Sequence, residues 1–123
     1  MTMGVIAVPA LGQKPALAML DRLEPGRWEL ASRDGSRNRE RICLRDARRL
    51  LQLQHAAGRC EQLVVDDSTT EVTVQYSCKG QGYGRTTIRR ETNRLVQIES
   101  QGIADGLPFE FSAEGRYLGP CSN

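Results

Sequence analysis

The stretch that decides the fold is residues 71–101, which read EVTVQYSCKGQGYGRTTIRRETNRLVQIESQ. Apolar or β-branched residues alternate with polar ones along it, and turn-forming residues interrupt it near 80–84 and 92–93. A period of two is typical of strands that bury one face. The stretch therefore predicts three consecutive antiparallel strands joined by tight turns.

The last hairpin of this stretch, residues 84–101, has a predicted register. A three-residue loop would set Ile88 across from Val96, and Arg85 across from Glu99 on the other face. Opposite charges that face each other across a sheet contribute about 0.2–1 kcal/mol. This pairing would account for part of the arginine content without a ligand.

Further strands are predicted on both sides of this stretch. The sequence favours a first hairpin from residues 27–31 and 39–44, and two more strands at residues 60–65 and 107–113. Pro108 removes a backbone donor from the last of these. We therefore expect that strand to lie at a sheet edge or at the seam of a barrel.

Two helical segments complete the predicted fold. Residues 14–24 carry leucines at helical spacing and end at Pro25, which predicts a short helix or leader. A longer helix is predicted between Asp46, which can cap it, and Gly58, which can end it. The apolar stripe of that helix is Ala47, Leu50, Leu51, Leu53 and Ala57. The expected fold class is mainly β (α+β), a curved antiparallel meander or partly closed barrel with one packed helix.

The length of 123 residues predicts one domain. Residues 1–12 resemble the end of a signal peptide, because small residues at Ala10 and Gly12 precede Gln13 at the spacing of a cleavage site. The predicted organisation is a signal-peptide remnant at 1–12, a leader or short helix at 13–24, and a β-rich domain at 25–123.

The charge pattern excludes some function classes. Seventeen basic and fifteen acidic residues give a net charge of +2, and the two signs are interspersed. This interspersed pattern argues against a nucleic-acid partner. No stretch approaches the roughly 18 apolar residues of a membrane span, so we expect none.

Four cysteines stand without a CxxC or any other short metal or redox spacing. Unclustered cysteines in a small domain are typical of disulfides in an oxidising compartment. We therefore expect a periplasmic or secreted protein, in which disulfides supplement a core that has few aromatic residues.

The face of the sheet on which each cysteine lies favours one of the three possible disulfide pairings. Cys78 falls on the apolar face of residues 71–78, whereas Leu63 and Val65 leave Cys60 on the opposite face of its strand. The predicted bridges are Cys43–Cys60, around the helix, and Cys78–Cys121.

An ordered set of motifs resembles a known family. The set comprises PGRWE at 25–29, Cys43-Leu44, Asp46, Cys60, Tyr76-Ser77-Cys78 and YLGPC at 117–121. Together they make residues 23–121 similar to the exported bacterial family called domain of unknown function 3617 (DUF3617). The resemblance implies periplasmic export and a small disulfide-bonded β-rich domain, and it implies no activity.

No residue constellation predicts catalysis, a metal or a cofactor. His55 is the only histidine and is expected at the surface or boundary of its helix. The glycines at 80–84 precede a strand, which indicates a hairpin turn and not a phosphate-binding loop. Asp66 and Asp67 lack the other ligands of a calcium loop and indicate a turn. The chain is therefore not expected to be an enzyme.

Two surfaces are candidates for partner contacts. Tyr83 is expected to be exposed at the tip of the glycine-rich turn. A cavity lined by Trp28, Leu50 and Phe109 would favour a small ligand, whereas a filled core with Tyr83 projecting would favour a protein partner. A basic surface around the second strand and the helix is predicted from Arg37, Arg39, Arg41, Arg45, Arg48 and Arg49.

The predicted function is an exported, monomeric, non-catalytic binding or accessory domain for an unknown protein or envelope component. One alternative is an inhibitor of a cell-wall hydrolase, because residues 76–80, YSCKG, are similar to a run found in small periplasmic lysozyme inhibitors. Another alternative is a domain that binds an anionic envelope component or lipid through the arginine-rich face.

Overall fold

The computed structural model describes residues 16–55 and 59–122, so the predicted signal-peptide remnant and the end of the predicted helix lie outside the described residues. Seven strands form one antiparallel sheet in the order β2-β1-β7-β6-β5-β4-β3, with β2 and β3 at its two edges. The sheet is curved but does not close, so the expected open alternative to a barrel is confirmed. The strands are β1 (Gly26–Ser32), β2 (Arg39–Leu44), β3 (Cys60–Asp67), β4 (Glu71–Cys78), β5 (Gly82–Thr92), β6 (Leu95–Ala104) and β7 (Leu107–Gly119).

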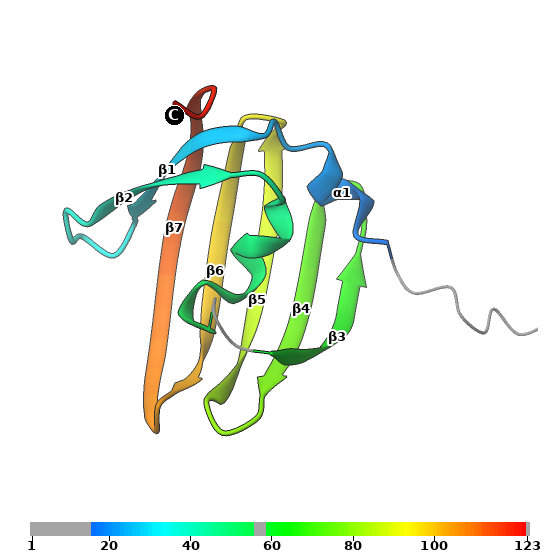
Figure 1. Cartoon of the computed structure of the whole chain (residues 1–123), viewed down its shortest axis with the longest axis vertical. Coiled ribbons are helices and arrows are strands. Elements are labelled where there is room, and N and C mark those ends of the chain that lie inside the picture. The colour runs from blue at the N-terminus through cyan, green and yellow to red at the C-terminus, as the bar shows by residue number, and fades with distance from the viewer. Residues whose placement is uncertain (1–15, 56–58, 123) are drawn as a thin grey trace, which may run out of the picture.

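The sheet curls around a 3₁₀ helix, η1 (Ala47–His55), which lies on its concave face (Figure 1). The short helix α1 (Ala18–Asp21) lies beside the other end of the same face, and β1 and β2 cross in front of the longer strands (Figure 1). The outer face of the sheet, behind the view of Figure 1, carries neither helix.

The concave face is filled by apolar side chains. Trp28 of β1 and Leu50 of η1 are both fully buried, so the space that could have held a cavity between them is packed. Burial of a large apolar side chain contributes about 1.5–3 kcal/mol. The other core residues come from the two helices, from residues beside them, and from β1, β2, β4, β5 and β6: Leu17, Met19, Leu20, Leu23, Leu30, Ile42, Leu44, Ala47, Leu51, Val72, Val74, Ile88, Val96 and Ile98.

The predicted helix is present, but it is a kinked 3₁₀ helix and not an α-helix. Gln52 interrupts it with φ −140° and ψ 52°. The predicted cap is confirmed, because the Arg48 backbone N–H donates to Asp46 Oδ1 at 3.0 Å. The break after Leu51 changes the direction of the chain, and His55 beyond it is buried, contrary to its predicted position at the surface or boundary of the helix.

The β5–β6 register is shifted by two residues from the prediction. Ile88 faces Ile98, and Arg85 faces Gln101 instead of Glu99. The reason is a two-residue turn combined with a bulge between Arg90 and Thr92, which together replace the expected three-residue loop.

The last strand is not an edge strand, because β7 lies between β6 and β1. However, β1 pairs with β7 only from Ala113 onwards, where Ser32 is its partner. Pro108 precedes this segment, so the strand has a free side where the proline lacks its donor. The first half of β7 therefore has one unpaired edge, as predicted. The prediction is wrong for the second half, which is paired with strands on both sides.

Both predicted disulfide pairings are wrong. The bridges are Cys60–Cys78 and Cys43–Cys121. Cys60 lies directly opposite Cys78 in the β3–β4 pair.

The error in the predicted face came from the edge strand β3. Leu63 is 63% exposed and Val65 is 46% exposed, whereas Val64 packs against the core. Apolar residues on the solvent face of β3 therefore reversed the assignment. Because the pleat has a period of two, reading the wrong face moved Cys60 to the wrong side.

The two bridges should contribute unequally to stability. Cys43–Cys121 spans a sequence separation of 78 and Cys60–Cys78 one of 18. In the chain-entropy model these loops correspond to about 4.5 and about 3 kcal/mol. We expect a Cys43→Ala/Cys121→Ala double variant to lose more free energy of unfolding in urea than a Cys60→Ala/Cys78→Ala variant. Equal losses, or peptide mapping without reduction that finds other bridges, would contradict this order.

Candidate binding surface

Two rows of side chains cross the outer face of the sheet near the β4–β5 turn. The register places one residue of the first row on every strand from β7 to β3 and one residue of the second row on every strand from β6 to β3, because residues opposite each other point to the same face. The first row is Glu110, Gln101, Arg85, Gln75 and Leu63.

The second row lies two residues further along each strand. It begins beside Pro108 and continues across the sheet through pairs that the register sets opposite each other. Its members are Ile103, Tyr83, Ser77 and Glu61. The two rows form the walls of an open trench of about 850 Å³ that runs across the strands.

The floor of the trench is the backbone of the intervening residues. Their side chains point to the opposite, concave face, so only main chain separates the two rows. The floor residues are Phe109, Gly102, Gly84, Tyr76 and Gln62.

Two glycines let the layers under the floor pack closely. A Cβ added at Gly84 would lie 2.5 Å from the Tyr76 ring, and one added at Gly102 would collide with the Tyr83 carbonyl. Any larger residue at either position would push the strands apart or displace the ring. The floor therefore depends on glycine at both positions.

The polar walls have unused hydrogen-bonding capacity. Within residues 16–55 and 59–122, the side chains of Gln75, Gln101, Arg85 and Glu110 make no hydrogen bond or ion pair with another residue. Amide, guanidinium and carboxylate groups together offer both donors and acceptors. These groups are therefore available to a ligand.

Tyr83 is exposed as predicted, with 56% of its surface accessible. It lies in β5 just beyond the turn, and its neighbours across the strands are Ser77 and Ile103. The sequence identified this one trench residue. The others were missed because the shifted β5–β6 register and the misread face of β3 kept the two rows from being recognised.

His55 supports the trench from beneath. Its Nε2 lies 3.1 Å from the Gln81 carbonyl oxygen and 3.0 Å from that of Ile103, while Nδ1 lies 2.9 Å from the Tyr76 hydroxyl. Carbonyl oxygens only accept, so Nε2 carries a proton and donates to them. Through these bonds one side chain joins η1 to the β4–β5 turn and to the trench wall.

Tyr76 completes this buried cluster. Its ring meets that of His55 edge-on, with 5.1 Å between centroids. Burial raises the pKa of the Tyr76 hydroxyl, so the group stays protonated within hydrogen-bonding distance of His55 Nδ1. The pair therefore has a structural function, and both ring nitrogens of His55 and the Tyr76 hydroxyl have hydrogen-bond partners.

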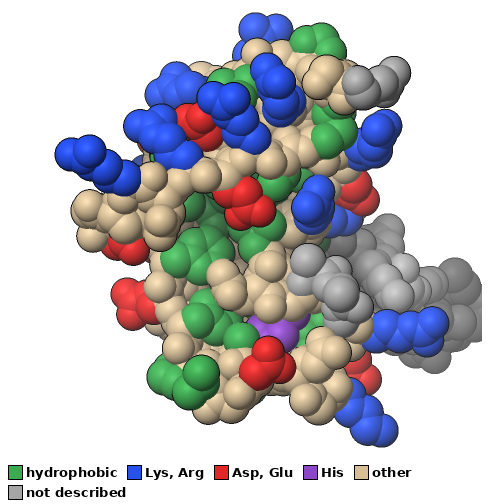
Figure 2. Space-filling view, turned by 60° about the vertical axis from the view of Figure 1, so that its left-hand side comes forward, with side chains coloured by type: hydrophobic (Ala, Val, Ile, Leu, Met, Phe, Trp, Pro, Cys, Tyr) green, Lys and Arg blue, Asp and Glu red, His purple; other side chains and the backbone are tan. Residues whose placement is uncertain are grey.

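The predicted basic surface is partly neutralised. Figure 2 shows Lys and Arg side chains gathered at one end of the molecule with acidic side chains among them. Arg39 Nη1 lies 2.8 Å from Glu29 Oε1, and Arg41 Nε lies 3.4 Å from Glu29 Oε2. Among the described residues, Arg37 and Arg45 have no such partner.

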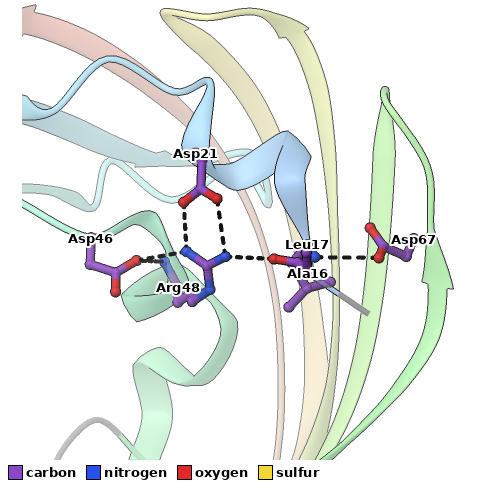
Figure 3. Close-up of polar contacts among 6 residues, drawn as sticks. All are labelled: Ala16, Leu17, Asp21, Asp46, Arg48 and Asp67. Carbon is purple, nitrogen blue, oxygen red and sulfur yellow. Dashed lines mark hydrogen bonds and ion pairs between the residues drawn. The ribbon is translucent and has the colours of Figure 1, made fainter. Parts of the chain in front are cut away.

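Arg48 is a structural residue of that surface (Figure 3). Its guanidinium lies 2.7 Å from Asp21 and 3.4 Å from Asp46, and it donates to the Ala16 carbonyl at 2.6 Å. These contacts join α1 to η1. Arg49 likewise donates to the Cys43 carbonyl at 3.3 Å, so both arginines serve the fold.

No group of three His, Cys, Asp or Glu side chains among the described residues is arranged to hold a metal ion. No helix in the same part of the chain is long and apolar enough to cross a bilayer.

These features define a class of protein: a small β domain with two disulfides, a packed concave face and an open trench on its outer face. The family described as "Protein of unknown function (DUF3617)" matches residues 23–121, which include all seven strands and all four cysteines. The chain belongs to this family, as the sequence motifs indicated. No curated protein and no solved structure matches the chain.

Replacement of His55 should destabilise the fold and the trench together. His55→Ala would leave the Ile103 and Gln81 carbonyls and the Tyr76 hydroxyl without their partner, at a cost of about 1–3 kcal/mol. We expect this loss in urea unfolding. Gln54→Ala, at an exposed position on the same helix, is the matched control and should change stability by less than about 0.5 kcal/mol. Equal effects of the two variants would show that His55 is not structural.

Acid should weaken the β1–β2 hairpin through Glu29. Its bonds to Arg39 and Arg41 hold the pKa of this carboxyl below the usual value of 4.5. Because the pKa is lowered by folding, the contribution is present above about pH 4.5 and is lost as the pH falls through the folded-state value. We expect Glu29→Gln to show a smaller loss of stability between pH 7 and about pH 3 than the native chain.

The measurement is the urea midpoint at each pH. Glu40→Gln is the control, since Glu40 lies exposed on β2 between the two arginines. This variant should retain the acid sensitivity of the native chain. A Glu29→Gln variant that remains equally acid-sensitive would assign the loss to other carboxyls.

Proposed function

We propose that this protein is an exported, non-catalytic binding domain that holds an envelope component or a protein partner in the trench. The observation that carries the proposal is the pair of rows across β3 to β7, where solvent-facing polar groups without internal partners flank Tyr83. Tyr83 stands in one wall of the trench, and the floor between the two walls contains Gly84 and Gly102.

Export is supported by the cysteines. All four form disulfides, and the described residues contain no free thiol. Such bridges persist in oxidising compartments and are rare in the cytosol. A periplasmic or secreted location follows as part of the proposal.

A non-catalytic role is supported by the state of the cysteine and histidine side chains, which often perform catalysis in other proteins. The cysteines are consumed in disulfides, and both nitrogens of the only histidine are engaged in a buried cluster. General acid–base catalysis uses His most often, and Cys is a common nucleophile. The trench offers carboxylates and amides, which suit binding.

The packed core argues against a ligand inside the domain. Trp28 and Leu50 fill the concave face, and Tyr83 projects from the outer one. Of the two arrangements expected from the sequence, this is the one that favours a protein partner. The partner therefore lies against the outer face of the sheet.

The arginine-rich face is a weaker candidate for binding. Arg39 and Arg41 share Glu29, and Arg48 is held by two aspartates. Neutralised charges attract anionic lipids or polymers less than free ones do. Inhibition of a cell-wall hydrolase stays a prediction. Within residues 76–80, on which that prediction depends, Tyr76 is buried and Cys78 is bridged to Cys60.

The location of the site can be tested by NMR. The full ¹⁵N-labelled chain is titrated with polysaccharide, lipid and protein fractions of a bacterial envelope. We expect chemical-shift changes confined to the two rows, and their loss in a Tyr83→Ala variant with native stability. Changes centred on Arg37 and Arg45 would transfer the function to the basic face. The absence of changes with every fraction would overturn the proposal.

A further inference from the structure

We infer that the trench binds a neutral, linear saccharide chain. This inference rests on the proposed function and names the class of ligand for the same site. It follows from the charges of the wall residues, from the pairing of the backbone hydrogen-bonding groups in the floor, and from the types of side chain that have no hydrogen bond within the described residues.

The trench walls carry one positive and two negative side chains, a net charge of −1. Arg85 lies between two carboxylates of the walls, Glu110 on β7 and Glu61 on β3. A site with this balance offers no net attraction to phosphate or other anionic groups. It also attracts a cationic polymer only weakly, so its charge is complementary to an uncharged ligand.

The floor of the trench does not favour a peptide. In its centre, β4, β5 and β6 are paired on both sides, so their backbone N–H and C=O groups are already used in the sheet. Peptides that add to a sheet need a free strand edge for main-chain hydrogen bonds. Recognition across these strands must come from side chains alone.

The free side chains suit hydroxyl groups. Gln75 and Gln101 each present an amide that both donates and accepts, and they lie on the two sides of Arg85 in the same row. Every sugar hydroxyl also donates and accepts, so a diol can pair with an amide or a guanidinium at two points. Since these groups face solvent and lack internal partners, no hydrogen bond within the protein has to break.

Tyr83 supplies the apolar complement. The pyranose ring has one face formed by C–H groups, which packs against an aromatic ring. Tyr83 is 56% exposed and stands beside Ile103, while Leu63 extends the apolar area at the β3 end. Tyrosine combines an apolar ring, which can pack against C–H groups, with a hydroxyl that can bond to a sugar hydroxyl.

The shape of the site favours a chain over a single sugar. The rows cross five strands, and strand spacings of about 4.8 Å give the trench a length of about 19 Å. The polar groups repeat at that spacing along the walls. A linear oligosaccharide lying across the strands would present hydroxyl groups to several of them in turn.

The test is a ¹⁵N NMR titration of the full chain with neutral oligosaccharides of increasing length from cello-, malto- and chito-oligosaccharide series. We expect shifts along both rows and an affinity that rises with length for at least one series. Tyr83→Ala and Gln101→Ala should each weaken binding about tenfold, equivalent to 1.4 kcal/mol. Arg89→Ala, on the outer face of the same strand but beyond the trench, is the matched control and should bind as the native chain does.

The outcomes separate this inference from the proposed function. If envelope protein or lipid fractions shift the trench residues and no oligosaccharide does, the saccharide inference is overturned and the binding role remains. The same conclusion follows if an unstructured peptide shifts the resonances of the trench residues and no oligosaccharide does. Oligosaccharide shifts outside the two rows also overturn the inference, and a trench that responds to no fraction and no sugar overturns both.

Discussion

The structure depends on the packing of η1 into the concave face of the sheet. A curled sheet leaves a hollow that must be filled, and Leu50 and Leu51 fill it against Trp28. A polar contact fixes the helix in place, because the buried Thr86 hydroxyl donates to the Leu51 carbonyl at 2.6 Å. This bond satisfies a helix carbonyl that the kink at Gln52 would otherwise leave without a partner.

The same packing limits the surface that is open to the proposed partner. Since the concave face is occupied, the outer face is the surface that remains free over the central strands. His55, at the end of η1, is bonded to the Ile103 carbonyl at 3.0 Å and thereby connects the core to the wall of the trench. A helix that is buried on one side of the sheet thus supports a candidate site on the other side.

Arginine has mainly structural uses in this chain. Arg48 joins two helices through Asp21 and the Ala16 carbonyl, and Arg39 and Arg41 hold the first hairpin through Glu29. The bidentate geometry of the guanidinium suits such multiple contacts. The apparent basic patch therefore has a smaller free charge than its composition indicates, whereas Arg85 in the trench keeps its donors available.

The sequence by itself determined the strands, the first hairpin, the exposed Tyr83, the family and the use of cysteines as disulfides. Local periodicity and turn residues carry that information. Only the tertiary structure decided the disulfide pairing, because Leu63 and Val65 are exposed on an edge strand and periodicity cannot say which face is buried. It also decided the burial of His55 and the alignment of the two rows, since a bulge between Arg90 and Thr92 sets which residues meet across strands far apart in the chain.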